Sequence, residues 1–402
     1  MKKVLMLTSI YPGPDIPKTF TPVVHYFTKE WDGMDVEVKV IHNLAYYPKF
    51  FYLLSFLFSK LISTITGTNI PTKRLSDDLT YRLENIDVHR FPMYKAFPHF
   101  KFSKKVFVVQ KNKILNELSK TDFVPDYIIG HWWNPQLELL EMLKKEFPKC
   151  TSCLVMHSKG EALLNLYKSR ALQLINSIDV FGFRSMPIKL KFEELFGNGK
   201  KSFMCYSGIP ESFTENVVSR TFSSELCRFL FVGVLIKRKF PSEIIESLNI
   251  VYPEKQFSLE YIGEGHESKK IIKKAKRLQL SGNIHLYGKL SRDQVWQKML
   301  FCECFIMISK DEAYGLVYLE AMAAGCITIA SKDEGFDGVI EHGVNGFLCE
   351  AGNIDELALL IEKINNLTVK EKIEISNNAI QTASELTNYN ASLNYLNSLK
   401  ID

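Results

Sequence analysis

Two glutamates eight positions apart, Glu312 and Glu320, flank a segment whose composition suits the binding of a diphosphate. An apolar run that ends at Ser309 predicts a strand, and Gly315 then opens a predicted helix. In a parallel sheet this order puts Glu312 at the carboxyl end of a strand, where ligands bind. The free amides at Gly315 and Leu316 would lie at a helix N-terminus, which is a ready anion site.

A carboxylate at Glu320 could accept bonds from the two hydroxyls of a ribose, as acidic residues do in other nucleotide sites. The alternative is that Glu312 is a surface loop residue and Glu320 a solvated helix residue. Glu320 lies inside the apolar run 316–322, where an unpaired charge is costly, and this favours the functional interpretation. Lys239 could stabilise the charge that develops on a leaving nucleoside diphosphate. The alternative is one more surface lysine in the basic run 237–239.

Short apolar runs alternate with amphipathic stretches along most of the chain, which is typical of parallel strands covered on both faces. Two such series predict an α/β protein with two doubly wound domains. A polar stretch from Ser207 through 215–224 interrupts the series and predicts the domain boundary. The expected strands are residues 4–8, 36–41, 86–91, 127–130, 154–157, 180–183, 203–206, 229–233, 259–263, 284–288, 305–309 and 327–331. The expected helices are residues 135–147, 187–195, 244–251, 269–278, 292–299 and 316–324.

The composition is that of a globular protein, with 402 residues, 46% hydrophobic and 24% charged. The net charge of +5 is too mild for a nucleic-acid binder. We find no secretory signal and no apolar run of about 20 residues. Most of the eight cysteines fall in apolar runs, so we expect reduced thiols in a cytoplasmic protein. Cys150 and Cys153 have the spacing of a metal or redox pair, but no second pair follows, which favours a structural role.

Residues 309–325 closely resemble the signature of the family 4 glycosyltransferases, in which seven residues separate two glutamates. Residues 231–233 together with Lys239 resemble the phosphate loop of that family. Residues 125–131 resemble a strand and loop of its first domain. Further similar segments follow in the family's order, at 207–209, 261–265, 283–288 and 343–348. The resemblance is strong after residue 228 and looser before it.

The resemblance implies the GT-B fold, with two facing Rossmann-like domains of which the second holds most of the donor. Residues 1–208 would form the acceptor-binding domain and 209–380 the nucleotide-sugar-binding domain, and 381–402 a C-terminal helix returning to the first. Glu312 would contact the transferred sugar near the reacting carbon. The other implied donor-site residues are Gly233, Lys237, Arg238, Lys239, Gly263, Gly288, Lys289, Ser309, Tyr314, Gly315, Leu316, Val317 and Glu320.

Histidines and tryptophans in the first half are candidates for the acceptor side. The resemblance gives His157 a role in orienting the sugar or the acceptor hydroxyl, although a lone histidine at a strand end is more often structural. His131 precedes Trp132 and Trp133, which we interpret as an exposed aromatic pair suited to stacking on an acceptor.

Three places depart from the family pattern. Val234 stands where the phosphate loop often has an arginine, so either a basic residue at 237–238 supplies the second positive charge or one phosphate contact is missing. Asp337 stands near the position where the donor-side loop often has a glutamate. In the N-terminal loop, many relatives carry a glycine pair, and Thr19 or Thr21 could substitute for it.

The resemblance implies a retaining, hexosyltransferase-type enzyme that moves a sugar from a nucleotide-sugar, with a UDP-sugar favoured. The acceptor would be a glycan or lipid-linked glycan in cell-surface polysaccharide biosynthesis (capsule, O-antigen or exopolysaccharide). No metal or other cofactor is implied, because the nucleotide-sugar is a co-substrate. Two alternatives stay open: a non-catalytic sugar-binding accessory protein, and a GT-B isomerase or phosphorylase.

Aromatic and basic residues are concentrated at 46–62 and 94–120, and the second stretch holds seven lysines. Both stretches lie in the expected acceptor half. We therefore hypothesise peripheral contact with an anionic membrane, at the inner face of the cell membrane. The alternative is ordinary core helices with a solvated basic face.

Overall fold

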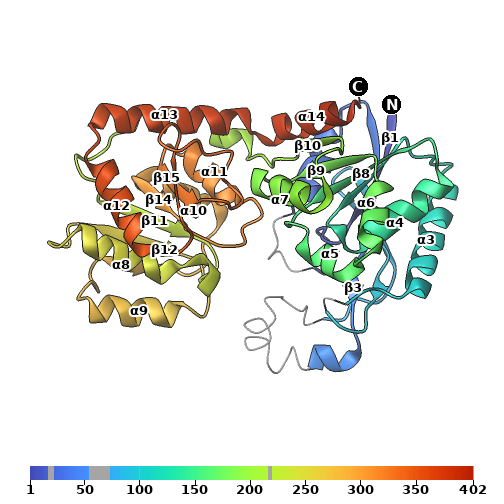
Figure 1. Cartoon of the computed structure of the whole chain (residues 1–402), viewed down its shortest axis with the longest axis horizontal. Helices are drawn as coiled ribbons and strands as arrows, with labels where there is room; N and C mark the ends of the chain where they lie inside the picture. Colours follow the sequence, from blue (N-terminus) through green and yellow to red (C-terminus); the bar gives the residue numbers. More distant parts are fainter. Residues whose placement is uncertain (17–21, 54–72, 99, 216–219, 402) are drawn as a thin grey trace. The chain divides into compact units, whose positions relative to one another are not determined.

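The computed structural model describes the chain except for residues 17–21, 54–72, 99, 216–219 and 402. The chain divides into two compact units (Figure 1). Unit 1 comprises residues 1–183, 190–205 and 392–402, and unit 2 comprises residues 184–189 and 206–391. Each unit contains its own sheet.

Unit 1 is built on an eight-stranded sheet. In spatial order its strands are β10 (Ser202–Met204), β9 (Val180–Phe183), β8 (Thr151–Met156), β7 (Tyr127–His131), β1 (Lys2–Thr8), β2 (Val36–His42), β5 (Ile86–Arg90) and β4 (Leu79–Leu83). All neighbours are parallel except β4 and β5, which form an antiparallel hairpin at one edge. The strand order reverses between β1 and β7, and open α/β sheets bind ligands at such a point.

Helices connect the strands of unit 1. They are α1 (Val23–Trp31), α3 (Lys104–Ser119), α4 (Trp133–Glu146), α5 (Glu161–Tyr167), α6 (Arg170–Asn176) and most of α7 (Met186–Phe196). The later part of α14 (Asn388–Leu399) also belongs to unit 1, where Trp31 Nε1 donates to the Ser392 carbonyl at 3.1 Å. A separate parallel pair consists of β3 (Ala45–Tyr46) and β6 (Met93–Tyr94).

Unit 2 is built on a six-stranded, fully parallel sheet. In spatial order its strands are β13 (Ile284–Leu286), β12 (Ser258–Ile262), β11 (Arg228–Val232), β14 (Cys304–Ile306), β15 (Ile327–Ser331) and β16 (Phe347–Cys349). Numbered from its own first strand, this is the order 3-2-1-4-5-6 of dinucleotide-binding sheets. The reversal falls between β11 and β14, so the loops after these two strands meet at the ligand-binding point of the sheet.

Several helices of unit 2 begin at residues that favour helix starts. The helices are α8 (Pro241–Val251), α9 (Ser268–Arg277), α10 (Arg292–Phe301), α11 (Leu316–Ala323), α12 (Ile354–Asn365) and α13 (Val369–Glu385), with 3₁₀ turns η1 (Glu211–Phe213) and η2 (Lys237–Lys239). Proline opens α8, and Ser291 with Gln294 forms a capping box at the start of α10. Gly315 precedes α11 in a left-handed conformation, at φ 89°.

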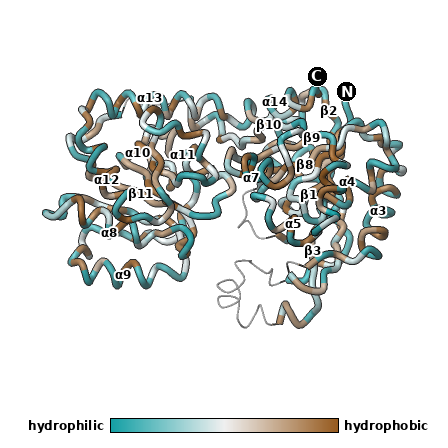
Figure 2. The backbone as a smooth tube through the Cα atoms, in the orientation of Figure 1, coloured by the Kyte–Doolittle hydropathy of each residue, from teal (hydrophilic) through white to brown (hydrophobic). Residues whose placement is uncertain are grey.

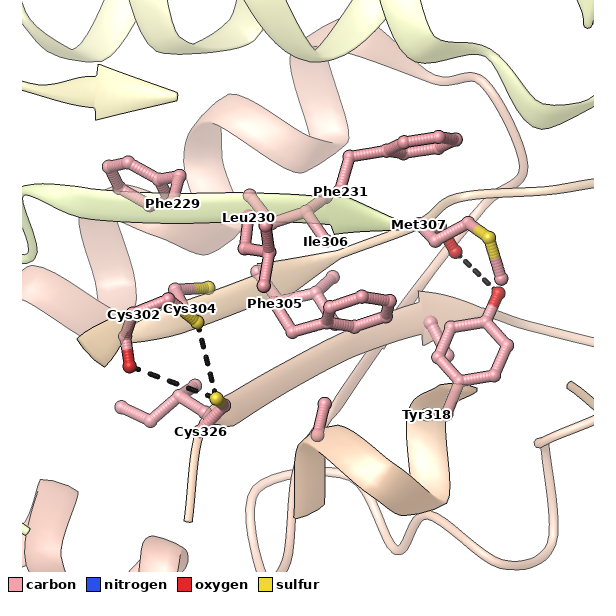
Figure 3. Packing of buried hydrophobic residues seen from close by; sticks show 14 of the residues in the cluster. Phe229, Leu230, Phe231, Cys302, Cys304, Phe305, Ile306, Met307, Tyr318 and Cys326 are labelled. Atoms are coloured by element: carbon pink, nitrogen blue, oxygen red, sulfur yellow. Dashed lines mark hydrogen bonds between the residues drawn. The ribbon is translucent and has the colours of Figure 1, made fainter. Parts of the chain in front are cut away.

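The apolar strands lie inside each unit, and the polar faces of the helices are outermost (Figure 2). In unit 2, Phe229, Phe231 and Phe305 are fully buried between the sheet and its helices (Figure 3). All eight cysteines are free thiols. Cys150 and Cys153 are both buried, and burial raises the pKa of Cys150 to about 11, so the structural interpretation of this pair is supported.

Each strand expected from the sequence overlaps an observed strand, and the two doubly wound units confirm the predicted fold class. The strands that the sequence did not reveal are β3, β4, β6 and β16. Three of them have only two or three residues, and β4 lies at a sheet edge where every residue is at least partly exposed. Among the described residues, no helix is both long and apolar enough to cross a bilayer.

Candidate active site

The loops after β11 and β14 are bound to each other at the switch point of the unit 2 sheet. The Lys310 amide donates to the Arg238 carbonyl at 2.7 Å, and Arg238 Nη1 donates to the Lys310 carbonyl at 3.0 Å. This reciprocal pairing fixes η2, which carries the three basic residues, against the loop that carries Glu312.

Lys239 and Glu312 form an ion pair, with 3.2 Å between Nζ and Oε2. Their side chains are only 11% and 16% exposed, whereas Arg238, 3.7 Å from the same oxygen, is 42% exposed. Lys239 Nζ also lies 3.4 Å from Met307 Sδ, at the end of β14. Two cations thus face the Glu312 carboxylate, and a bound anion could also pair with them.

Glycines at the ends of β11 and β12 allow backbone to pack on backbone. A Cβ on Gly263 would lie 1.9 Å from the Gly233 carbonyl oxygen, and one on Gly265 would lie 2.1 Å from the Leu235 oxygen. The Gly263 amide donates to the Gly288 carbonyl at 2.7 Å. In this structure Gly233, Gly263 and Gly288 therefore shape the rim of the site through their backbones.

The loop before α11 orients the first amides of that helix. Gly315 adopts φ 89°, and a Cβ there would lie 2.6 Å from the ring of Tyr318. The amides of Leu316 and Val317 belong to the first helical turn, where intrahelical partners are missing, and the helix dipole adds partial positive charge. Both amides therefore lie at the N-terminus of α11, directly after the Glu312 loop, where they can donate to an anion.

Ser309 and Tyr314, which the resemblance assigns to the donor, make contacts inside the protein. Ser309 is fully buried, with Oγ 3.1 Å from Tyr318 OH, and Tyr318 OH donates to the Met307 carbonyl at 2.6 Å. Tyr314 OH donates to the Ser207 carbonyl at 2.9 Å. These bonds give both residues a part in holding the loop shape.

Glu320 lies further along α11 and pairs with Arg292, the first residue of α10. Arg292 Nε and Nη2 lie 3.0 and 2.6 Å from Glu320 Oε1. Burial raises the pKa of Glu320, and the Arg292 guanidinium opposes that rise. The structure therefore gives Glu312 and Glu320 separate cationic partners.

Sequence reasoning missed Glu334 and Arg292. Glu334 is 7% exposed, and its Oε2 accepts a hydrogen bond from the Glu312 amide at 2.9 Å. This buried carboxylate therefore fixes the Glu312 loop. Asp337, which we considered for that position, accepts the Asp333 amide at 2.7 Å and closes its own loop. In the sequence, the feature that could have indicated Glu334 is its position directly before Gly335.

The remaining donor-side candidates are solvent-exposed. Lys237 and Lys289 are exposed, and Val234, at the expected arginine position, is 56% exposed. Among the described residues, no group of three or more His, Cys, Asp or Glu side chains is placed to hold a metal ion.

In unit 1, two histidines meet beside the switch point between β1 and β7. His131 Nδ1 lies 3.0 Å from His157 Nε2, and His131 Nε2 lies 3.1 Å from Tyr395 OH. The Trp132 ring stacks on His157, with 4.0 Å between centroids and 17° between planes. Trp133 Nε1 donates to Ser158 Oγ at 3.3 Å.

The aromatic pair at 132–133 is partly buried rather than exposed, so that expectation was wrong. The stacking on His157 and the bond to Ser158 explain the burial. Trp132 has φ 64°, which turns the chain sharply after β7. Thr19 and Thr21 lie outside the described residues.

Comparisons with known proteins agree with this geometry. Residues 212–382 match the family described as Glycosyl transferases group 1. An uncharacterized glycosyltransferase of Methanocaldococcus jannaschii is 26% identical over 304 residues, covering 72% of this chain and 78% of that protein. The N-acetyl-alpha-D-glucosaminyl L-malate synthase of Bacillus anthracis is 30% identical over 122 residues, covering 30% of this chain and 32% of that protein.

Solved structures of similar fold cover the whole chain. Anabaena HepE in complex with UDP superposes with a TM-score of 0.66 at 18% identity, and each chain is covered completely. The apo form of the lipopolysaccharide outer core galactosyltransferase WaaB gives a TM-score of 0.68 at 17% identity, covering 100% of this chain and 99% of that one.

The two Rossmann-like units thus constitute a GT-B fold. Residues 212–382 are similar to the group 1 glycosyl transferases, and the glycosyltransferases among the relatives support a transferase enzyme.

Proposed function

We propose that this protein is a retaining glycosyltransferase that uses a UDP-sugar and extends a glycan acceptor in cell-surface polysaccharide biosynthesis. The observation that carries the proposal is the largely buried Lys239–Glu312 pair at the switch point of unit 2. UDP is the first nucleotide to test, because the similar HepE structure is a complex with UDP.

The ion pair suggests how donor binding and chemistry are coupled. An incoming diphosphate competes with Glu312 for Lys239, since both are anions within reach of the same ammonium. Lys239 and the amides of Leu316 and Val317 then stabilise the charge that develops on the leaving nucleoside diphosphate. Glu312, released from Lys239, accepts a hydrogen bond from a hydroxyl of the sugar near the reacting carbon.

The roles of the other candidates follow from their surroundings. Glu320 accepts bonds from the ribose hydroxyls. His157, stacked on Trp132 and bonded to His131, orients the transferred sugar or the acceptor hydroxyl. No metal enters the scheme, because Lys239 and the helix N-terminus supply the positive charge.

A mutation at Glu312 tests the proposal. We expect the purified chain to hydrolyse or transfer from a UDP-sugar, and Glu312→Ala to lower that rate about 100-fold or more. Glu362→Ala, on an exposed face of α12, is the matched control and should keep the wild-type rate. Wild-type activity in Glu312→Ala would refute the site assignment, and activity of the wild type with a GDP- or ADP-sugar alone would refute the UDP donor.

An aromatic patch on unit 1 supports peripheral membrane contact. Phe50, Leu53, Phe97 and Phe100 are 50%, 63%, 50% and 64% exposed, and Phe51 packs edge-on against Phe97 at 5.8 Å. Much of the stretch 46–62 lies outside the described residues.

Such exposed apolar side chains beside lysines suit an anionic membrane surface. We expect the protein to float with vesicles containing phosphatidylglycerol and to do so less with Phe97→Ser/Phe100→Ser. Phe301→Ser, a 72% exposed phenylalanine of unit 2, should float as the wild type does. Absence of wild-type flotation on anionic vesicles would contradict the membrane proposal.

A further inference from the structure

Arg292 contacts Glu320 in a way that leaves part of the carboxylate available. Nε and Nη2 of Arg292 both approach Oε1, at 3.0 and 2.6 Å. A carboxylate has about four lone-pair sites on two oxygens. Oε2 therefore keeps its capacity to accept bonds from other donors.

Arg292 is held in place by aromatic rings. Its guanidinium lies 5.0 Å from the centre of the Phe213 ring. Phe213 stacks on Trp296, one turn further along α10, with 4.2 Å between centroids and 14° between planes. A planar guanidinium can stack and donate two bonds at once, which a lysine ammonium cannot do.

The charge of Arg292 also matters for the protonation state of Glu320. The Glu320 side chain is 13% exposed, and its burial raises the pKa. Helix α11 packs against α10 and α13, and within the described chain Arg292 of α10 is the charged group that acts on Glu320. Without it, the carboxylate would take up a proton at a higher pH and lose acceptor capacity.

We infer that Arg292 is a positioning residue for nucleotide recognition, which fixes Glu320 Oε1 so that Oε2 is presented as an ionised acceptor to the ribose hydroxyls. The inference rests on the proposed function, since it needs a ribonucleotide donor at unit 2. It adds a residue of α10 to the recognition of the sugar of the nucleotide.

The test compares UDP with 2′-deoxy-UDP by calorimetric titration of the full chain. We expect the wild type to bind UDP about tenfold more tightly, the value of one hydrogen bond to a charged acceptor. Arg292→Met should reduce this preference to about twofold or less at about pH 6 and reduce it less at about pH 8, because a higher pH favours the ionised carboxylate. Arg292→Lys, which keeps the charge but not the geometry, should show an intermediate preference at both pH values. Arg277→Met removes an exposed arginine that pairs with Glu246 and should leave the preference unchanged.

The outcomes separate the inference from the proposed function. A wild type that does not bind UDP refutes the UDP donor. A wild type that binds UDP and 2′-deoxy-UDP equally refutes the ribose role of Glu320 and the inference with it. A full wild-type preference in Arg292→Met at both pH values overturns the inference alone. If Arg292→Met does not fold, full preference in Arg292→Lys overturns it instead.

Discussion

The two units have the same kind of switch point but line it with different chemistry. In unit 2 the loops after β11 and β14 bring the two cations Lys239 and Arg238 to Glu312. In unit 1, His131 at the end of β7 and Trp132 directly after it both contact His157, which follows β8. The doubly wound sheet decides where a ligand binds, and the loops decide which chemical groups face that ligand.

The largest expected effect comes from removing the cation of unit 2. Lys239→Met should lower turnover of a UDP-sugar about 1000-fold, because a fixed cation no longer meets the charge of the leaving group. Steady-state assays of sugar release would measure this. Lys363→Met, on an exposed face of α12, should be neutral, and equal losses in both variants would contradict the assignment.

Replacing a glycine near the end of a strand with alanine should lower the unfolding free energy more in unit 2 than in unit 1. Gly263→Ala puts a Cβ 1.9 Å from a backbone oxygen at φ 135°, and we expect at least about 3 kcal/mol of lost unfolding free energy. Gly130→Ala, inside β7 of unit 1, meets the Gln136 side chain at 2.8 Å and should lower the unfolding free energy by about 1–3 kcal/mol. Denaturant unfolding would measure both, with Gly282→Ala as the control in open space. A cost for Gly130→Ala above that for Gly263→Ala would reverse the comparison.

Acid should destabilise unit 1 through a buried histidine. Burial lowers the pKa of His42 to about 4, below its usual value of about 6.5. The unfolded chain therefore binds a proton before the folded one, and stability present above pH ~6.5 is lost as the pH falls toward 4, by up to about 3 kcal/mol.

The variant His42→Asn should flatten this dependence in stability measured by denaturant unfolding between about pH 7 and pH 4. Glu320 in unit 2 contributes to the pH dependence of stability with the opposite sign. Its raised pKa means that the folded chain binds a proton more readily than the unfolded chain, so this contribution favours the fold at low pH. An unchanged slope in His42→Asn would show that other groups dominate the acid response.

The smallest effect is expected on the acceptor side. His157→Gln should lower transfer to the acceptor about 10- to 100-fold and leave the affinity for UDP unchanged. Comparing UDP titrations with transfer rates separates these two quantities. A matching loss of UDP affinity would show that His157 takes part in nucleotide binding. It would contradict the assignment of nucleotide binding to unit 2 alone.

The sequence predicted the alternation of strands and helices because apolar runs of strand length are easy to recognise between helical patterns. It also singled out Lys239, Glu312 and Glu320 as a charged group. It did not predict their partners, since the contact of Arg292 with Glu320 depends on how α10 packs against α11.

The burial of Trp132 and Trp133 was likewise not predicted, because it depends on contacts with a distant segment. Trp132 was expected to be exposed, but its ring stacks on His157, and that contact depends on where the loop after β8 lies. Similarly, Glu334 gave only a weak signal, because its bond to the Glu312 amide joins two loops 22 residues apart. Side-chain partners across loops are set by tertiary packing, which a single sequence does not encode locally.

The central claim is that the unit 2 switch point recognises a diphosphate through Lys239, and titration of UDP and uridine tests it most directly. We expect the wild type to bind UDP at least about 100-fold more tightly than uridine, and Lys239→Met to lose most of that difference while keeping its affinity for uridine. An unchanged ratio of UDP to uridine affinity in Lys239→Met would contradict the claim.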